Sequence, residues 1–230
     1  MTHPRRIGKA QRRGLAEEAA DRIRDAIFAG LFPPGAAVRE VELAEALEVS
    51  RGSVREGLAM LEREGLLQSA WHRGTRVIDL TIGDIEEVYS VRAALERLAT
   101  TTAAERVGEA DLRRLDEIVD TMSAEIDARA EGPRLLALDI EFHDQIYAAA
   151  GNRRLLDAWQ ALRSQVYLFQ LSRIRLGDED YRSRLVAEHA ELAALLRHRD
   201  LAMLAEVAEE HVHSARRALV GRMAAQLMNR

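Results

Sequence analysis

Residues 49–66 limit most narrowly what this chain can fold into. Ser50 is suited to cap a helix, apolar residues recur after it at helical spacing, and Gly65 is suited to end it. Arg51 and Arg55 are four residues apart, so both lie on the face opposite the apolar stripe. Such a helix has the form of a DNA recognition helix, because guanidinium groups pair with guanine edges and phosphates. A solvated amphipathic helix is the alternative for this stretch taken alone.

The segments before this helix favour DNA binding. Apolar spacing predicts a first helix over residues 15–29, ended by Gly30 and the Pro-Pro-Gly sequence that follows. A second helix is expected over residues 40–47. The tight turn at residues 48–49 joins it to the arginine-bearing helix, which gives a helix-turn-helix.

The segment after this helix has the pattern of a wing. Residues 66–69 and 75–80 read as two short strands of a hairpin, and residues 36–38 as a short extended piece. Arg73 and Gly74 fall at the hairpin tip, where glycine allows the backbone to come close to a DNA groove. Trp71 is expected to pack the wing onto the body of the domain.

Composition bounds the class of protein. The chain has 230 residues, with 4% aromatics, no cysteine and abundant alanine and leucine, which is typical of a mainly helical protein of one large or two small domains. Disulfides and thiolate metal sites are excluded. No apolar run reaches the about 18 residues of a membrane span, and the first residues lack the apolar core of a signal peptide. A cytoplasmic location is therefore expected.

Charge is distributed unevenly between the two parts of the chain. The net charge of −5 divides into +2 for residues 1–78 and −7 for residues 79–230. Residues 1–14 contain five basic residues and no acidic one, which predicts a flexible basic arm. Such an arm suits contact with phosphates, although short basic tails also serve solubility alone.

From residue 84 to about 222 the pattern predicts helices only. The fold expected for the whole chain is mainly α, with a winged helix-turn-helix over residues 15–80 followed by an all-α bundle of about six helices. The six helices are expected at residues 84–107, 111–130, 133–149, 152–174, 181–197 and 201–227.

Four polar residues of the second domain lie where core residues are expected. Asp139 and His143 are four apart on one apolar helix, and His189 and His211 lie on the apolar stripes of two others. Each histidine alone is best explained as a core residue bonded to a carbonyl. Together, three imidazoles and a carboxylate are a ligand set for a divalent first-row metal, and facing helices of a bundle are a usual place for one. Zn²⁺ is the first choice, and Ni, Mn or Fe are compatible.

Residues 19–78 resemble the N-terminal domain of the GntR family of bacterial repressors. The matching motifs lie at residues 26–35, 40–51 and 54–66, in order and with the family's spacings. The resemblance implies that Arg51 and Arg55 contact an operator and that Gly74 lies at the wing tip. Ser53, on the same helix, and Arg73 complete the expected DNA contacts.

Three residues depart from the GntR pattern. Val41 stands where many members have an arginine that reaches DNA, and Gly52 and Gly57 replace better helix formers. Each glycine is expected to cost about 1 kcal/mol in a helix interior.

The second domain resembles the FCD effector domain of the FadR subfamily. The motifs are Asp139-x-x-Phe142-His143, Gly151-Asn152-x-x-Leu155, Glu188-His189, and His211 twenty-two residues later. The resemblance implies a metal held by Asp139, His143, His189 and His211, with a small carboxylate effector beside or on it. All four ligand positions are present, which argues against the metal-free branch that binds acyl-CoA.

Two further residues are candidates for binding the effector. Arg92 falls in an apolar helical stripe, where it would either snorkel at the edge or clamp the carboxylate of the effector, as the family's arginine is thought to do. Asn152 is a candidate for the same pocket, although a helix-capping role is preferred.

Together these features predict a metabolite-responsive transcription regulator, a repressor by preference, that binds a pseudo-palindromic operator as a homodimer. One alternative is a constitutive DNA-binding regulator whose metal is purely structural. Another is a metal-dependent hydrolase. The winged helix counts against the hydrolase, as does the absence of an additional acid or base near the ligand motifs in the sequence.

Overall fold

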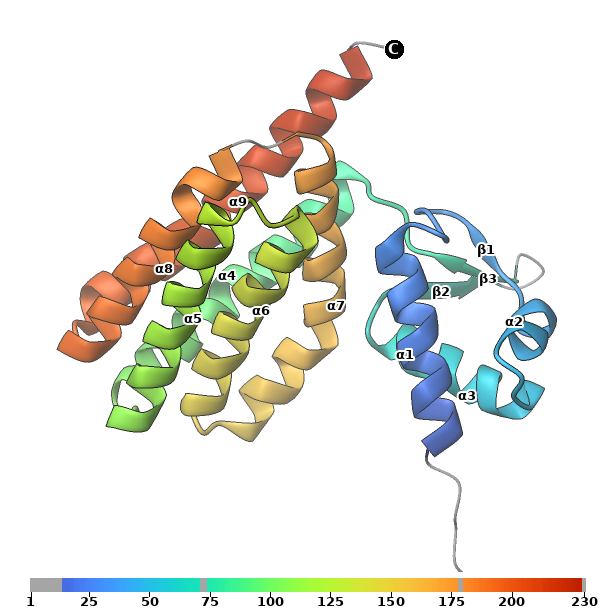
Figure 1. Cartoon of the computed structure of the whole chain (residues 1–230), viewed down its shortest axis with the longest axis horizontal. Helices are drawn as coiled ribbons and strands as arrows, with labels where there is room; N and C mark the ends of the chain where they lie inside the picture. Colours follow the sequence, from blue (N-terminus) through green and yellow to red (C-terminus); the bar gives the residue numbers. More distant parts are fainter. Residues whose placement is uncertain (1–13, 71–73, 178–179, 229–230) are drawn as a thin grey trace, which may run out of the picture. The chain divides into compact units, whose positions relative to one another are not determined.

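The computed structural model describes residues 14–70, 74–177 and 180–228, and the chain divides into two compact units, residues 1–78 and 79–230. The expected mainly helical class is confirmed, with a winged helix-turn-helix in the first unit and a six-helix bundle in the second (Figure 1). Most of the predicted basic arm, residues 1–13, lies outside the described residues, as do Trp71 and Arg73. No helix in the described ranges is both long and apolar enough to cross a membrane.

Three helices build the first unit: α1 (Gly14–Ala29), α2 (Glu40–Ala46) and α3 (Arg51–Arg63). The apolar faces of α1 and α3 meet and are fully buried. As expected, Ser50 caps α3, and its hydroxyl oxygen accepts a hydrogen bond from the backbone N–H of Ser53 at 3.1 Å. This cap fixes where α3 begins, and so where its first-turn side chains point.

The wing contains three strands where the sequence predicted a hairpin of two. β1 (Ala37–Val38), β2 (Leu67–Ala70) and β3 (Gly74–Val77) form an antiparallel sheet in the order β1-β3-β2. The extended piece before α2 pairs with the hairpin, with Ala37 opposite Arg76. The last strand ends at Val77, and the expected strand residues beyond it are not part of the sheet.

Gly57 is explained by the packing of α1 against α3. A Cβ atom at this position would lie 2.9 Å from the carbonyl oxygen of Ala16 and 3.1 Å from the backbone N of Ala20. Gly57 weakens the helix, as expected from the sequence, but it allows the backbones of α1 and α3 to come close. Arg24 of α1 adds a bidentate ion pair to Glu64, with N–O distances of 2.9 and 2.6 Å.

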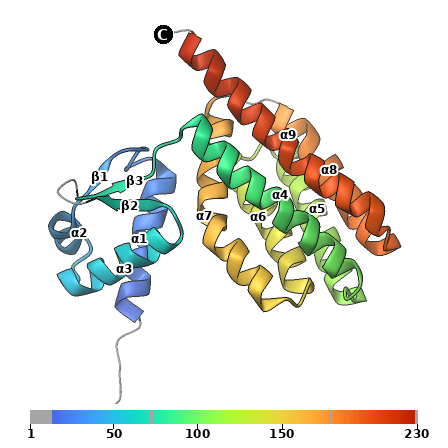
Figure 2. The same cartoon turned by 180° about the vertical axis from the view of Figure 1, so that it is seen from behind.

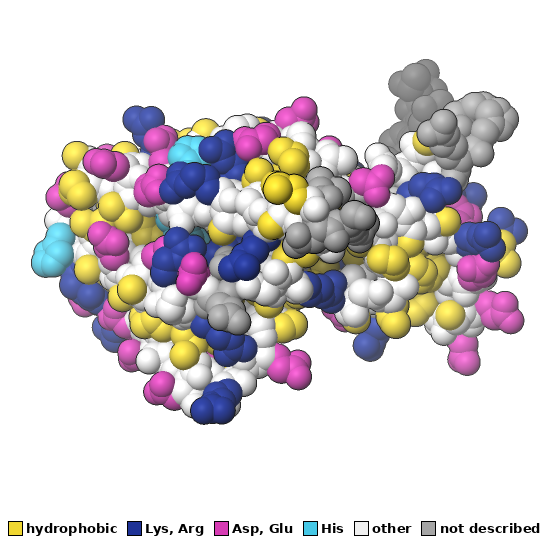
Figure 3. Space-filling view, turned by 90° about the horizontal axis from the view of Figure 1, so that it is seen from above, with side chains coloured by type: hydrophobic (Ala, Val, Ile, Leu, Met, Phe, Trp, Pro, Cys, Tyr) yellow, Lys and Arg dark blue, Asp and Glu magenta, His cyan; other side chains and the backbone are white. Residues whose placement is uncertain are grey.

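The second unit consists of six helices whose bounds agree with the predicted ones within three residues. They are α4 (Ile82–Ala104), α5 (Glu109–Asp127), α6 (Gly132–Ala149), α7 (Arg153–Arg175), α8 (Asp180–His198) and α9 (Leu201–Met228). Thr81 and Asp84 form the expected capping box at the start of α4. The longest contact runs between α4 and α9, which lie side by side (Figures 1 and 2). On the face drawn in Figure 3, acidic and basic side chains are intermixed with apolar ones.

The two glycines of α3 give a matched test of this packing. Gly52→Ala should raise the free energy of unfolding by about 0.5–1 kcal/mol, because its Cβ would meet only the Ser50 hydroxyl at 3.7 Å. Gly57→Ala should lower it by about 1–3 kcal/mol, because the added methyl group forces α1 away. Urea unfolding of the full chain, followed by circular dichroism, measures both. Equal stabilisation by the two substitutions would contradict the close approach.

Candidate metal centre and DNA-binding helix

Three helices bring Asp139, His143, His189 and His211 together in the middle of the bundle. Asp139 and His143 lie one turn apart on α6, His189 comes from α8, and His211 comes from α9. Their exposed fractions are 2%, 0%, 0% and 8%, and one ligand atom from each lies within 4.8 Å of the others. The side chains that the sequence placed on separate apolar stripes thus form one buried cluster.

The spacing of the ligand atoms fits a divalent metal ion. The Oδ1 atom of Asp139 lies 3.3 Å from Nε2 of His143 and 3.2 Å from Nε2 of His189, and the Nε2 atoms of His143 and His211 are 3.3 Å apart. Metal–nitrogen bonds of about 2.0–2.1 Å place neighbouring ligands about 3.0–3.4 Å apart. The observed separations fall in this range.

The Nδ1 atom of each of the three histidines, on the side away from the cluster, is bonded to a hydrogen-bond acceptor. Nδ1 of His143 bonds Glu96 Oε1 at 2.7 Å, Nδ1 of His189 bonds the Leu185 carbonyl at 2.7 Å, and Nδ1 of His211 bonds Glu188 Oε2 at 3.0 Å. When Nδ1 donates, the lone pair of Nε2 points into the cluster, as a metal ligand requires. Lone pairs of His143 and His211 then face one another at 3.3 Å, an arrangement that a cation between them stabilises. The donor set therefore fits a metal such as Zn²⁺.

The electrostatics of the cluster are those of tightly coupled buried charges. Burial opposes the charged form of His143, but the charge of Glu96 and the hydrogen bonds to Asp139 and Glu96 raise its pKa to about 9. Burial lowers the pKa of His211 to about 4. Burial would raise the pKa of both carboxyl groups, but the neighbouring histidines outweigh it. They lower the pKa of Glu96 to about 2 and that of Asp139 well below its usual value.

Glu96 is the site residue that the sequence analysis missed. It is fully buried on α4, and its second oxygen accepts a hydrogen bond from the Tyr147 hydroxyl at 3.2 Å. The expectation that no additional acid lies near the ligands was wrong, since both Glu96 and Glu188 contact ligand histidines. The available signal was spacing, because Glu96 lies four residues after Arg92 on the same buried face. Both carboxylates orient imidazoles in this arrangement.

Arg92 is fully buried, and its guanidinium group lies beside two aromatic rings. None of its three side-chain nitrogens has a partner among the described residues, and its exposed fraction is 0%. Its guanidinium carbon lies 5.8 Å from the ring centroid of Tyr89 and 5.9 Å from that of Trp159. The Tyr89 hydroxyl is likewise buried without a hydrogen-bond partner in the described part of the chain. Arg92 therefore does not snorkel to the surface.

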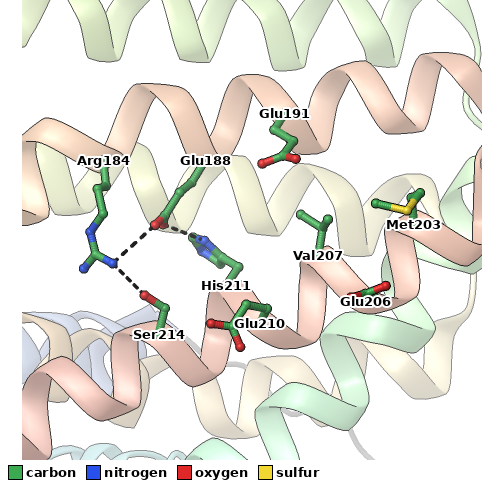
Figure 4. A pocket seen from close by; sticks show the side chains of 9 residues that line it. All are labelled: Arg184, Glu188, Glu191, Met203, Glu206, Val207, Glu210, His211 and Ser214. Carbon is green, nitrogen blue, oxygen red and sulfur yellow. Dashed lines mark hydrogen bonds and ion pairs between the residues drawn. The ribbon is translucent and has the colours of Figure 1, made fainter.

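Two cavities adjoin the cluster on the side of α8 and α9. A small one is lined by Asp139, His189 and His211 together with Tyr181, whose hydroxyl donates to Asp139 Oδ2 at 3.2 Å. The second, of about 330 Å³, is a groove between α8 and α9 (Figure 4). Glu188 lines both and connects His211 to the groove.

Asn152 caps a helix, as preferred from the sequence. Its side-chain oxygen accepts a hydrogen bond from the backbone N–H of Leu155 at 3.2 Å, at the start of α7. This bond accounts for one of its polar atoms without an effector.

The candidate DNA-binding residues lie on one side of α3 and at the wing. Arg51 and Arg55 are exposed and form no ion pair with an acidic residue in the described parts of the chain. The Ser53 hydroxyl is bonded to the Ser50 hydroxyl at 2.9 Å, so it contributes to the cap. Gly74 has a φ of 71°, a conformation that favours glycine. Arg73 lies outside the described residues.

Both units match known protein families. Residues 15–77 match the bacterial regulatory proteins of the gntR family, and residues 87–214 match the FCD domain. The "Uncharacterized HTH-type transcriptional regulator YdhC" of Bacillus subtilis (strain 168) is 27% identical over 84% of this chain and 83% of its own length. The "Probable D-xylose utilization operon transcriptional repressor" of Paenarthrobacter nicotinovorans is 36% identical over 66% of each chain.

Among solved structures, a GntR transcriptional regulator from Rhodococcus sp. RHA1 has the same fold. Its TM-score is 0.72 at 23% identity, over 90% of this chain and 97% of that one. With both domains matched in order, this chain belongs to the GntR family of bacterial transcription regulators, in the FadR subfamily with an FCD domain, and not to a family of enzymes.

Proposed function

We propose that this regulator is a repressor that binds a pseudo-palindromic operator as a homodimer, and that a small carboxylate effector bound at the metal centre controls its affinity for DNA. The effector is inferred from the buried guanidinium group of Arg92, whose nitrogens have no hydrogen-bond partner among the described residues. The name of the Paenarthrobacter relative, a repressor of an operon for sugar use, supports repression by a regulator of metabolism.

A buried guanidinium group without a hydrogen bond is costly. Removing a charge from water costs several kcal/mol unless an opposite charge and hydrogen bonds replace the water, on the order estimated for buried ions. Arg92 lowers the pKa of Glu96 from close by, so it lies near the metal centre. A carboxylate bound beside Arg92 would accept the bidentate hydrogen bonds that the geometry of a guanidinium group favours. We infer that this is the carboxylate of the effector.

The metal would be held by Asp139, His143, His189 and His211. When bound, it would attract a carboxylate oxygen as a Lewis acid. Zn²⁺ remains our first choice, while Ni, Mn or Fe more readily accept the additional ligand that direct effector binding requires. Four protein ligands also suit a structural zinc ion, so a constitutive regulator with a structural metal is the second candidate.

The DNA-binding unit would place α3 in the major groove, with Arg51 and Arg55 on base edges or phosphates. Two such units in a homodimer would read half-sites about 34 Å apart. Binding of the effector would shift the bundle and with it the spacing of the recognition helices. By linkage, DNA must then weaken effector binding as much as the effector weakens DNA binding.

Arg55→Ala should raise the dissociation constant of an operator, selected from random-sequence DNA, by about 10-fold to 100-fold. Arg63→Ala is the matched control, because this exposed arginine lies in the last turn of α3, away from the end that meets bases. Fluorescence anisotropy at fixed salt measures both. Unchanged affinity for the Arg55 variant would remove its assigned role.

His189→Ala should leave less than one metal ion per chain by elemental analysis, because one of four ligands is lost. His198→Ala, at the exposed end of the same helix, should retain the metal of the unaltered chain. Retention of a full equivalent in the His189 variant would show that the ligand set is wrong.

Arg92→Met should abolish the thermal shift that an effective acid produces, while metal content stays unchanged. The screen uses acetate, lactate, succinate, citrate and gluconate on the metal-loaded protein. The melting temperature without acid should not fall, because the lost guanidinium group makes no hydrogen bond. Arg163→Met is the control, since Arg163 is paired with Asp144 at 2.7 Å. A chain whose melting and operator affinity respond to no acid would instead support the structural-metal alternative.

A further inference from the structure

Three tyrosines are buried in the described part of the helical unit, and two of them donate a hydrogen bond to a carboxylate at the metal centre. The Tyr147 hydroxyl donates to Glu96 at 3.2 Å, and the Tyr181 hydroxyl donates to Asp139 at 3.2 Å. The Tyr89 hydroxyl is fully buried but has no hydrogen-bond partner among the described residues. A buried hydroxyl without an acceptor is costly. Tyr89 therefore lacks the kind of acceptor that the other two tyrosines have.

The Tyr89 hydroxyl lies close to Arg92 and to the metal centre. Tyr89 precedes Arg92 by three residues on the buried face of α4, and the guanidinium carbon of Arg92 lies 5.8 Å from the centre of the Tyr89 ring. Burial raises the pKa of the Tyr89 hydroxyl, the positive charge of Arg92 opposes this rise, and the negative charge of Asp139 adds to it. The hydroxyl is therefore near both the arginine and a metal ligand.

Helix α7 holds both donor side chains in place. The ring of Phe169 lies parallel to that of Tyr89, with the centroids 6.4 Å apart and the planes at 6°. The centre of the Trp159 ring lies 5.9 Å from the guanidinium carbon of Arg92. Packing of this kind fixes the directions of the hydroxyl and the guanidinium group. The two side chains are thus positioned before any ligand binds.

The carboxylates at the metal centre already accept other hydrogen bonds. The two oxygens of Glu96 are bonded to His143 and Tyr147. The two oxygens of Asp139 are bonded to His189 and Tyr181. An acceptor for Tyr89 is therefore expected from a ligand.

The donors of Tyr89 and Arg92 outnumber the acceptor sites of one carboxylate. A guanidinium group offers five N–H donors and a tyrosine one O–H donor, whereas a carboxylate accepts about four hydrogen bonds. All three side-chain nitrogens of Arg92 lack a hydrogen-bond partner among the described residues, as does the Tyr89 hydroxyl. A second oxygen on the ligand would reduce this mismatch. That oxygen must lie beside the carboxylate, because the two donor side chains are close together.

We propose that Tyr89 is a specificity-determining residue, whose hydroxyl donates to an oxygen on the carbon next to the carboxylate of the effector. This inference rests on the proposed function for the effector itself, and adds its chemical class, a 2-hydroxy or 2-oxo acid. Arg92 binds the carboxylate, and Tyr89 binds the neighbouring oxygen. An acid without this oxygen leaves the hydroxyl unpaired and binds more weakly.

Pairs of acids that differ in this one oxygen test the inference. Calorimetric titration of the full, metal-loaded chain compares glycolate with acetate, lactate with propionate, malate with succinate, and gluconate with 2-deoxygluconate. In each pair that binds, the 2-hydroxy acid should bind at least about tenfold more tightly. Pyruvate should share the preference over propionate. 3-Hydroxypropionate, which carries the hydroxyl one carbon further away, should bind no more tightly than propionate.

Tyr89→Phe should reduce this preference to less than about threefold, chiefly by weakening the 2-hydroxy acid. The melting temperature without acid should not fall, because the lost hydroxyl has no hydrogen-bond partner among the described residues. Tyr147→Phe is the matched control, since it removes a buried hydroxyl that is bonded to Glu96. It should lower the melting temperature and retain the preference, whatever its effect on the affinity for both acids of a pair. Circular dichroism and metal content verify that each variant is folded and loaded.

The outcomes separate this inference from the proposed function. Equal binding of both acids in every pair that binds, or a Tyr89→Phe chain that keeps the full preference, would overturn the role of Tyr89 and leave effector control standing. The same loss of preference in Tyr89→Phe and Tyr147→Phe would also overturn it, because the effect would then not be specific to the unpaired hydroxyl. Binding of no acid by the unaltered, metal-loaded chain would refute effector control, and this inference with it.

Discussion

The helical unit depends on one constraint, which is that several charges are buried together in its centre. Asp139 and Glu96 are ionised among histidines, with exposed fractions of 2% and 0%. A buried charge is costly unless it is paired and hydrogen-bonded, as these carboxylates are. The bond between Glu96 and His143 links α4 to α6, that between Glu188 and His211 links α8 to α9, and that between Asp139 and His189 links α6 to α8. A divalent ion in the cluster would add a further connection between three of these helices.

This arrangement makes α4 the element through which the proposed events can be coupled. Its inner side presents Arg92 and Glu96 to the metal centre, and α4 is the helix that follows the DNA-binding unit along the chain. A ligand that binds Arg92 would act on the first helix after the DNA-binding unit. Coupling between effector and DNA then requires only that α4 has two positions, between which the effector discriminates.

The sequence was sufficient to predict the helices and the candidate metal ligands, because both follow from local periodicity. Asp139 and His143 share a face by spacing, and apolar stripes pointed His189 and His211 inward. Sequence patterns were insufficient for features that depend on contacts between distant segments of the chain. The role of Gly57 depends on the backbone of α1, and the third strand depends on the pairing of Ala37 with Arg76. The role of Glu96 depends on its contact with His143 of another helix.

The balance of charge explains why a carboxylate, in particular, suits the centre. With a divalent metal bound and the histidines neutral, Asp139 and Glu96 would supply two negative charges against three positive ones from the metal and Arg92. Glu188, the carboxylate behind His211, is itself paired with Arg184 at 3.7 Å, so that pair adds no net charge. An excess positive charge in a medium of low dielectric is costly, and a single carboxylate between the metal and Arg92 neutralises most of it. A neutral sugar would leave that charge uncompensated. Under the proposed function, the metal and Arg92 would together select an acid over its neutral analogue.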